Sequence, residues 1–519
     1  MPAVFARRPA RSTPLCNNRF IRIGCTGRAA IQPMPMHARP FLAEPPLSEN
    51  TPNPARVADA PMSAGHRFAM AAIMLSVALA SLDTAIANTA LPAMAADLHA
   101  KPAASVWIIN AYQLAMVATL LPLAALGDIV GHRRIYIGGI GVFTVASLAC
   151  ALSPTLPLLA GARVVQGLGA AAIMSVNTAL IRHLYPPHQL GRGVGLNALV
   201  VGVSFAVGPT VASLILSVAD WPWLFAVNVP LGVLALSFAL PGLPRTPRGT
   251  HHFDRVAALL NVITFAALIF ALGEAAQRAP SAIVLGAAAI AIVFGALLMR
   301  REAGHPAPML PVDLFKLPVF ALSAVTAVCS FAAQGLAFVS LPFYFEDVLH
   351  RSQVETGFLM TPWPVVVALA APFAGRLSDR YPPGLLGAIG LAILCGGMAS
   401  LAMLPAHPPL IDITIRMAIC GAGFGFFQSP NLKALMASAP PNRSGGASGI
   451  IATSRLIGQT TGAALVALSF SVAGRHGPTL SLAAGALFAG AASIASGLRL
   501  FAPSHRAQTV VTAVRAKEQ

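Results

Sequence analysis

The chain has 519 residues, of which 56% are hydrophobic and only 10% are charged, and its mean hydropathy is +0.72. An ordinary soluble domain has about 25% charged residues, so a chain this apolar could not cover a water-facing surface, and a soluble protein is excluded. The 34 Lys and Arg residues against 17 Asp and Glu give a net charge of +17. These basic residues stand in short clusters between long apolar runs, which is typical of membrane flanks and not of a nucleic-acid interface.

The first part of the chain is rich in Pro and Arg and shows no apolar period, so we expect residues 1–66 to be a disordered segment. An Arg-rich, acid-poor leader can also be an organellar transit peptide. Six prolines between Pro2 and Pro40 would break the amphipathic helix of such a peptide, which disfavours that alternative. Met62, just before the first apolar run, is a second candidate for the initiator.

Fourteen apolar stretches follow, each long enough to cross about 30 Å of hydrocarbon as a helix, which takes roughly 18 or more residues. They lie near residues 68–93, 104–126, 135–153, 157–180, 193–216, 222–242, 256–275, 280–299, 319–345, 355–375, 384–404, 409–431, 447–472 and 478–501. We therefore predict an all-α polytopic membrane protein with 14 transmembrane helices. Four of the six cysteines lie inside these stretches and no CxxC pair occurs, so neither a disulfide framework nor a metal site is predicted.

Alternate loops carry most of the basic residues. The loops on one side, together with the C-terminal tail, hold 18 Lys and Arg residues, whereas the loops on the other side hold only Lys101, Arg278, Arg351 and Arg475. By the positive-inside rule the richer side faces the cytoplasm. Because the number of spans is even, we expect both termini to be cytoplasmic, in a multi-pass protein of the cell (plasma or inner) membrane.

Two loop sequences indicate an internal duplication. Gly127-Asp128 follows the second span and Ser378-Asp379 follows the tenth, and aligning the two aspartates carries the first six spans onto the last six. We predict two six-helix pseudo-repeats with a two-helix insert. The predicted parts are an N-terminal bundle at 67–242, the insert at 255–300, a C-terminal bundle at 318–502 and a cytoplasmic tail at 503–519.

Several motifs carry a family resemblance. They are Leu82-Asp83-Thr84 in the first span, Trp107-Ile108-Ile109-Asn110-Ala111-Tyr112-Gln113-Leu114 at the start of the second, Arg163-Val164-Val165-Gln166-Gly167 in the fourth and Trp221-Pro222-Trp223-Leu224-Phe225 at the start of the sixth. Over residues 67 to about 502 the chain resembles the fourteen-helix, drug:proton antiporter branch of the major facilitator superfamily. The resemblance implies the major facilitator fold and transport by alternating access between the two bundles.

The resemblance also assigns an antiport-motif helix and a cytoplasmic gate. Gly208 and Pro209 stand at the centre of the motif associated with antiport, where Ser204, Ala212 and Ser213 replace its usual glycines. The gate residues, expected to form and break contacts, are Asp128, Gly131, Arg133, Arg134, Asp379 and Arg380. Ala124 and Ile129 replace the Gly and Arg that the family usually has there, so part of its charge network is missing.

Asp83 is the only acid well inside a predicted span. A charge near the bilayer centre costs about 2.5 to 3.5 kcal/mol, so an intramembrane carboxyl is a functional candidate by default. All thirteen histidines fall in tails, loops or span edges, so if a proton crosses on a side chain, we expect Asp83 to carry it. The alternative is a carboxyl that is hydrogen-bonded to Asn88 or to another helix and has no part in transport.

Arg163 and Gln166 share one polar, small-residue face of the fourth span. The resemblance implicates this arginine in proton handling. It could modulate the protonation of Asp83, or it could only bond carbonyl oxygens and fix helix packing, and both interpretations stay open. Arg455 and Gln459 repeat the pattern on the thirteenth span, where a packing arginine is the preferred interpretation.

The polar and aromatic candidates for a substrate cavity are Trp107, Tyr112, Gln113, Gln334 and Gln428. Each of these residue types more often packs than binds a ligand, because the lining of an apolar cavity resembles core. No second intramembrane acid occurs in the C-terminal half. This favours neutral, amphipathic or singly charged substrates over dications.

The sequence lacks the motifs of other energy sources and chemistries. None of the four lysines follows a glycine, so a phosphate-binding loop for ATP is excluded, and neither a His-Glu-x-x-His nor a Gly-x-Ser-x-Gly motif occurs. We expect no enzymatic activity, no nucleic-acid partner and no cofactor besides the proton gradient. The predicted function is proton-coupled export of small amphipathic or lipophilic drugs by a monomer. Export of a specific metabolite and, in a different class, a non-transporting membrane scaffold or sensor are the alternatives.

Overall fold

The computed structural model describes residues 64–186, 189–246, 253–276, 280–303, 312–438 and 444–502. The predicted segment 1–66, except for its last three residues, and the whole predicted tail 503–519 lie outside these ranges. Met62–Gln519 forms one compact unit. Within its described part the chain is built from helices without a strand, as the sequence predicted.

The helices follow the predicted spans in chain order. The N-terminal group consists of α2 (Ala64–Thr89), α3 (Leu91–Asp97), α4 (Pro102–Ser105), α5 (Trp107–Val130), α6 (His132–Ala151), α7 (Leu156–Leu184), α8 (Leu190–Leu216), α9 (Pro222–Ala226) and α10 (Asn228–Gly242). The insert consists of α11 (Arg255–Ala276) and α12 (Ser281–Glu302). The C-terminal group consists of η1 (Val312–Lys316), α13 (Pro318–Phe343), η2 (Tyr344–Val348), α14 (Gln353–Met360), α15 (Pro362–Leu377), α16 (Pro383–Ala402), α17 (Leu410–Ser438), α18 (Ser444–Ala473), η4 (Gly474–His476) and α19 (Gly477–Leu498).

All fourteen predicted spans are found among the described helices. Thirteen stretches there are long and apolar enough to cross a membrane, and the last of them, Gly449–Leu498, contains most of α18 and all of α19, which η4 separates. The tenth span is divided into α14 and α15. The break falls where α15 begins at Pro362, whose nitrogen has no hydrogen to donate for a continuous helix.

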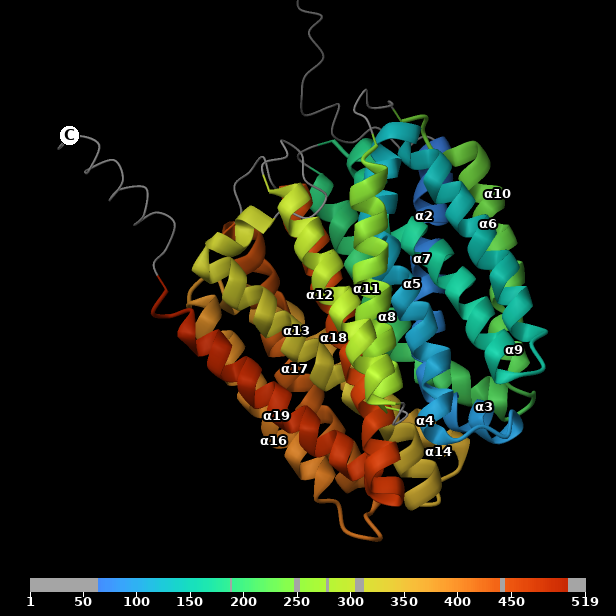
Figure 1. The fold of residues 1–519 in the computed structure, drawn as a ribbon, viewed down its shortest axis with the longest axis vertical. Coiled ribbons are helices and arrows are strands. Elements are labelled where there is room, and N and C mark those ends of the chain that lie inside the picture. Colours follow the sequence, from blue (N-terminus) through green and yellow to red (C-terminus); the bar gives the residue numbers. More distant parts are fainter. Residues whose placement is uncertain are drawn as a thin grey trace, which may run out of the picture. The chain divides into compact units, whose positions relative to one another are not determined.

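The helices pack as two groups joined by the insert (Figure 1). In the N-terminal group α7 packs against α5 and α6, and α2 packs against α8 and α10. In the C-terminal group α13 packs against α18 and α19, and α16 packs against α17 and α19. The insert helices α11 and α12 lie against each other, and α11 also contacts α5 and α18, one helix from each group. The residue boundaries of the two bundles stay a prediction.

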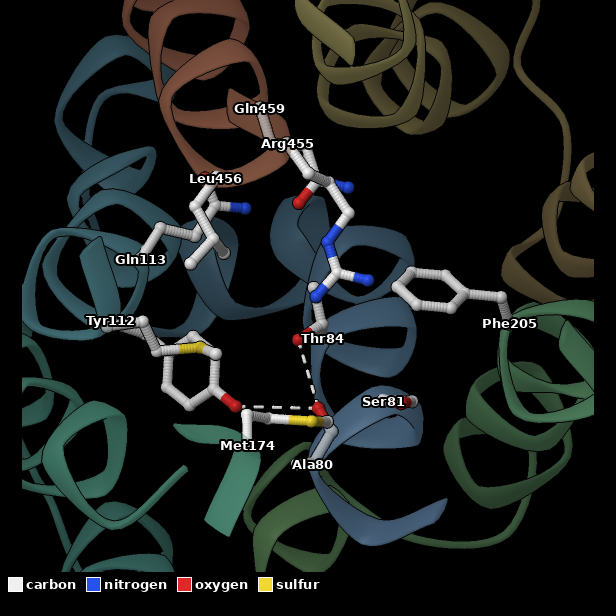
Figure 2. A pocket seen from close by; sticks show the side chains of 11 residues that line it. Ala80, Ser81, Thr84, Tyr112, Gln113, Met174, Phe205, Arg455, Leu456 and Gln459 are labelled. Carbon is white, nitrogen blue, oxygen red and sulfur yellow. Dashed lines mark hydrogen bonds between the residues drawn. The ribbon is translucent and has the colours of Figure 1, made fainter. Parts of the chain in front are cut away.

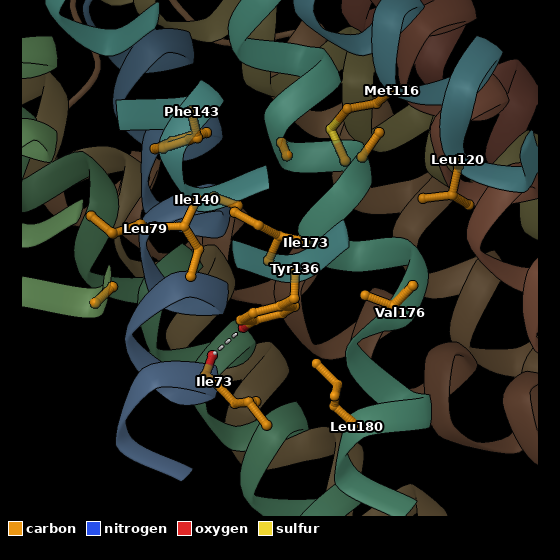
Figure 3. Close-up of a cluster of buried hydrophobic side chains, with 14 of the residues drawn as sticks. Ile73, Leu79, Met116, Leu120, Tyr136, Ile140, Phe143, Ile173, Val176 and Leu180 are labelled. Atoms are coloured by element: carbon orange, nitrogen blue, oxygen red, sulfur yellow. Dashed lines mark hydrogen bonds between the residues drawn. The ribbon is translucent and has the colours of Figure 1, made fainter. Parts of the chain in front are cut away.

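An apolar core holds the N-terminal group together, and Ile73 of α2, Ile140 and Phe143 of α6 and Ile173 of α7 are buried in this one cluster (Figure 3). Gly169 of α7 permits close approach here, because a Cβ at this position would lie 2.5 Å from the backbone nitrogen of Phe143. Lipid tails are as apolar as these side chains. Close packing, and not withdrawal from water, therefore stabilises the contact between α6 and α7.

Large apolar side chains also cover the outer surface. On α12, which is mostly unburied, Leu285 is 68% exposed and Ile292 is 72% exposed. In water so extensive an apolar face would drive aggregation, whereas in a bilayer it is solvated by lipid. The described helices are therefore those of a multi-pass membrane protein.

Asp254 joins the two helices of the insert. Its Oδ1 accepts hydrogen bonds from the backbone N–H groups of Val256 (3.1 Å) and Ala257 (3.0 Å) at the start of α11. Its Oδ2 accepts a hydrogen bond from Nε of Arg301 on α12 at 2.8 Å. The bond from Arg301 lowers the pKa of the Asp254 carboxyl from its ordinary value.

Asp254→Ala is expected to lower the free energy of unfolding by about 1 kcal/mol, the usual loss for a helix-capping side chain. Because the folded pKa is lowered, the contribution of the carboxylate is present above the unfolded pKa of about 3.9 and is lost as the pH falls through the folded value. Thermal unfolding in detergent from about pH 7 down to about pH 3 measures both effects. A variant that unfolds at the temperature of the parent protein throughout this range would contradict the role given to Asp254.

Candidate functional site

Asp83 lies in α2 and is 2% exposed. Its Oδ2 accepts a hydrogen bond from Nη1 of Arg163 at 2.5 Å, which makes an ion pair. Its Oδ1 accepts hydrogen bonds from Nε2 of Gln166 at 2.9 Å and from Nδ2 of Asn228 at 3.0 Å. The carboxylate thus has partners from α7 and α10 on both oxygens, and Asn88 of its own helix is not one of them.

Arg163 is also almost completely buried, at 1% exposure. Besides pairing with Asp83, its Nε donates a hydrogen bond to the backbone oxygen of Ile108 at 3.0 Å. Its guanidinium lies over the ring of Tyr112, 4.2 Å from the ring centroid. Arg163 therefore makes both contacts that the sequence suggested, one to a carbonyl oxygen and one to the buried acid.

Gln166 extends the site to α6. Its Nε2 also donates to Oγ of Ser147 at 2.9 Å, and its Oε1 accepts from Arg163 at 2.6 Å and from Sγ of Cys150 at 3.5 Å. We call Asp83, Ser147, Cys150, Arg163, Gln166 and Asn228 the Asp83 network. It contains one negative and one positive charge, so it is neutral as a unit, and the removal of either charge would leave the other buried and uncompensated.

A cavity of about 20 Å³ lies between the two helix groups (Figure 2). Helices α2, α5, α7 and α8 of the N-terminal group and α18 of the C-terminal group line it with Ala80, Ser81, Thr84, Tyr112, Gln113, Met116, Met174, Phe205, Arg455, Leu456 and Gln459. One water needs roughly 10–15 Å³, whereas a drug-sized ligand occupies a pocket of roughly 300–1,000 Å³. In this conformation the cavity therefore has room for about one water molecule.

Tyr112 separates the cavity from the Asp83 network. Its ring lines the cavity and also packs on the Arg163 guanidinium, and its hydroxyl donates to the backbone oxygen of Ala80 at 3.4 Å. Neither Asp83 nor Arg163 is among the residues that line the cavity. The Tyr112 ring therefore contacts both the cavity and the Arg163 guanidinium.

Arg455 reaches into the cavity from α18, on the C-terminal side. Figure 2 shows its guanidinium between Thr84 of α2 and Phe205 of α8. Its Nε is buried and has no hydrogen-bond partner in the part of the chain that the structure describes. Gln459, one turn further along α18, also lines the cavity, and its Nε2 donates to Oε1 of Gln334 at 3.2 Å.

Of the other residues predicted to contact substrate, some line the cavity and others do not. Tyr112 and Gln113 line the cavity, and Oε1 of Gln113 accepts a hydrogen bond from Thr460 of α18 at 3.1 Å, which links the two groups. Trp107 instead packs against Gly273 of the insert helix α11. Gln428 is half-buried on α17 and does not line this cavity.

The first predicted gate loop, between α5 and α6, is held by local contacts. Gly131 has a φ of 105°, which a residue with a side chain adopts only under strain. Nη2 of Arg133 donates to the backbone oxygen of Leu240 at 2.6 Å, which ties the loop to the end of α10. Asp128 pairs with Nε2 of His132 at 2.9 Å.

The second predicted gate loop, after α15, also differs from the expected charge network. Asp379 pairs with Nζ of Lys433 on α17 at 2.5 Å. Arg134 and Arg380 are exposed, and no ion pair of either arginine occurs among the described residues. In this conformation Asp128 therefore pairs with a histidine and Asp379 with a lysine, each within its own helix group. Such exposed pairs each contribute only about 0–1 kcal/mol.

The antiport-motif helix α8 packs closely against α2. A Cβ on Gly208 would lie 2.4 Å from Cβ of Ala85, so only glycine permits this approach. The backbone oxygen of Pro209 accepts a hydrogen bond from Oγ of Ser213 at 3.0 Å. Ser213, which replaces a glycine of the family motif, is thus part of the packing of this helix.

The same helix joins the two groups at the end of the molecule where Figure 1 shows α14. Ser213 Oγ donates to the backbone oxygen of Gln353 at 2.8 Å, and the hydroxyls of Thr210 and Thr361 are 2.7 Å apart. A Cβ on Gly357 of α14 would lie only 1.7 Å from Ser213 Oγ. The contact between α8 and α14 therefore has no room for an added methyl group.

Sequence reasoning missed three members of the Asp83 network. Asn228 was visible as a polar residue three positions after the Trp221–Phe225 motif, in a run that is otherwise apolar, and polar residues inside spans are candidates for function. Ser147 and Cys150 gave no such signal, because both residue types are common in apolar helices that have no site.

Known proteins share this architecture. The Major Facilitator Superfamily model matches residues 73–463. The chain is 52% identical over 443 residues to "Uncharacterized transporter YebQ" of Escherichia coli (strain K12), covering 85% of this chain and 96% of that protein. It is 30% identical over 402 residues to "Riboflavin transporter RibZ" of Clostridioides difficile (strain 630), covering 77% of this chain and 87% of that protein. It is also 30% identical over 452 residues to the "Methylenomycin A resistance protein" of Streptomyces coelicolor, covering 85% and 94%.

Solved structures show the same fold. A bacterial homolog of the human lysosomal transporter Spinster, in an inward-facing and unoccupied conformation, superposes with a TM-score of 0.62 at 14% identity, covering 85% of this chain and 98% of that one. A D-xylose-proton symporter superposes with a TM-score of 0.62 at 15% identity, covering 82% and 96%. This chain belongs to the Major Facilitator Superfamily, and it is a membrane transporter.

Proposed function

We propose that this transporter is a proton-coupled exporter of small amphipathic or lipophilic compounds, of the fourteen-helix drug:proton antiporter type. The observation that carries the proposal is the Asp83 network. It contains a buried ion pair of Asp83 with Arg163, and the Tyr112 ring lies between this pair and a cavity that both helix groups line. An acid inside a membrane span is by default a candidate for a functional role, such as carrying a proton. Asp83 is the proposed carrier, and Arg163 is its proposed regulator.

Protonation of Asp83 would couple to the cavity through Arg163. A protonated carboxyl is neutral, so its attraction for the Arg163 guanidinium weakens. That guanidinium packs on the ring of Tyr112, which is a wall of the cavity. A shift of Arg163 would therefore move or release the wall, and substrate occupancy and protonation would compete.

Alternating access would then require the two helix groups to part at the α14 end, where α8 and α14 are in contact. The positive-inside bias makes the end with the Gly131 loop the cytoplasmic one, in a bacterial inner membrane, with both termini on that side. Asp128 and Asp379 sit in weak, exposed pairs there, so their partners can be exchanged at small cost. The proposed gate residues are available for that exchange.

The names of the relatives favour two substrate classes. One relative is named for methylenomycin A resistance and others for multidrug resistance, which supports drug export. Another is named a riboflavin transporter, which supports the alternative, export of a specific metabolite. In either case a membrane potential contributes about 2.3 kcal/mol per charge per 100 mV to uphill transport.

Accumulation of the neutral lipophilic dye Nile red in cells tests the proposal. Cells that express the protein are expected to hold less dye than control cells, and an uncoupler that collapses the proton gradient is expected to restore the dye to the control level. Dye accumulation and drug sensitivity that are unchanged by expression, across a screen of dyes and antibiotics, would favour the non-transporting scaffold. Export that survives the uncoupler would contradict proton coupling.

A further inference from the structure

Arg455 is a half-buried cation without a counter-charge. Its guanidinium stands in the central cavity, its Nε is buried without a partner, and no ion pair or hydrogen bond of Arg455 occurs among the described residues. Two arginines that are more deeply buried do have partners. Arg163 pairs with Asp83, and Nη1 of Arg499 donates to Asn431 at 2.7 Å and to Ser323 at 3.0 Å.

The nearby acid cannot neutralise Arg455 in this conformation. The Asp83 carboxylate lies behind Tyr112, where it is already paired with Arg163 and bonded to Gln166 and Asn228. The cavity therefore carries a net charge of about +1. An arginine does not lose its proton in proteins, and a buried charge without a partner is costly, so this side chain needs an anion or water to satisfy it.

The rest of the cavity lining is suited to the apolar and aromatic part of an organic ligand. Tyr112 and Phe205 offer aromatic faces, Met116 and Met174 offer adaptable apolar surface, and Gln113 offers an amide. A single uncompensated positive charge matches a monoanion, because a dianion would bring an excess negative charge into an apolar site. A planar carboxylate can accept two parallel hydrogen bonds from a guanidinium.

We propose that this cavity is a binding site for small amphipathic monocarboxylates and that Arg455 holds their carboxylate. The inference rests on the proposed function, because it names the substrate class of the same transporter. The cavity now has room for about one water molecule, so an aromatic carboxylate enters only when α18 moves away from α2, α5 and α8. The hydrogen bond from Thr460 of α18 to Gln113 of α5 would have to break in that movement.

A matched pair of ligands isolates the charge. The probes are 1-naphthoate and its neutral counterpart 1-naphthamide, which share a ring system and differ in charge. Isothermal titration calorimetry measures their binding to the purified full-length protein in detergent. The parent protein is expected to bind naphthoate at least tenfold more tightly than naphthamide. Arg455→Gln is expected to lose at least tenfold in naphthoate affinity and to bind naphthamide unchanged, whereas Arg455→Lys retains part of the preference.

The matched control is Arg475→Gln, which removes an exposed arginine from η4 and is expected to bind naphthoate like the parent protein. Arg455→Gln removes a half-buried charge that has no counter-charge, so it should unfold at the same temperature as the parent protein or at a higher one. Naphthoate binding that is equal in the parent protein and in Arg455→Gln, or no saturable binding of naphthoate to the parent protein, would overturn the proposal.

The two proposals fail separately. If uncoupler-sensitive export of Nile red occurs while naphthoate does not bind, then the anion site is wrong and the exporter stands. If naphthoate binds through Arg455 but no compound is exported at the expense of the proton gradient, then the anion site stands and the exporter is wrong. If Arg455 instead serves only as a partner for Asp83 in another conformation, Arg455→Gln will impair Nile red export without changing the naphthoate preference, which also overturns the anion site.

Discussion

Asp83→Asn is expected to abolish proton-coupled export. Asparagine cannot take up and release a proton. In addition, the described span interiors hold no other acid in the Asp83 network that could replace it. One coupled charge at a potential of 100 mV contributes about 2.3 kcal/mol, equal to a substrate gradient of roughly 50-fold, and the variant should lose that whole factor. The measurement uses energised inverted vesicles and an acridine dye that reports proton release when a substrate is added.

Asp412→Asn is the matched control for this experiment. Asp412 also pairs with an arginine, Nε of Arg416 at 2.9 Å, but it is partly exposed and lies at the start of α17, away from the cavity. This variant is expected to release protons on substrate addition as the parent protein does. Undiminished coupled transport by Asp83→Asn would refute the role given to Asp83.

The second large effect concerns stability. Arg163→Gln is expected to lower the free energy of unfolding by about 3–5 kcal/mol, because it leaves the Asp83 carboxylate buried without its counter-charge. Asp83→Asn should cost a similar amount, since it isolates the Arg163 guanidinium in the same way. The double variant Asp83→Asn/Arg163→Gln removes both charges and is expected to recover most of the loss. Thermal unfolding in detergent of the four proteins gives the coupling between the two residues.

Two additive losses in the double variant would show that the ion pair does not stabilise the N-terminal group. The double variant also serves the transport experiment, because it should be folded and yet unable to carry a proton. Because Asp83 pairs with Arg163, the single variant Asp83→Asn changes stability as well as proton transfer. The charge-balanced double variant separates the two effects.

Sequence could predict the spans because each had to be apolar over a full bilayer thickness, a constraint that no tertiary contact can relax. It singled out Asp83 for the same reason, since an acid among apolar residues stands out. It could not decide what Arg163 does, because that residue is 80 positions away and only the packing of α2 against α7 brings the two together.

The gate and the cavity were less accessible to sequence reasoning. His132 and Lys433 pair with Asp128 and Asp379 although exposed arginines stand nearby in the sequence. Which of several nearby cations pairs with an exposed acid depends on local geometry that the sequence does not show. Arg455 was interpreted as a packing residue. Whether Arg455 is satisfied depends on atoms of the four other helices that line the cavity, which no spacing along one helix reveals.

The separation of Asp83 from the cavity by Tyr112 has a consequence for how such a protein could change its cargo. Every member of the Asp83 network belongs to α2, α6, α7 or α10, whereas α18 supplies Arg455, Leu456 and Gln459 to the cavity. In the proposed mechanism, substitutions on that one helix would change substrate selectivity and leave the proton-carrying network intact. A single substitution on α18 would then change which compound is bound without passing through a variant that has lost proton coupling.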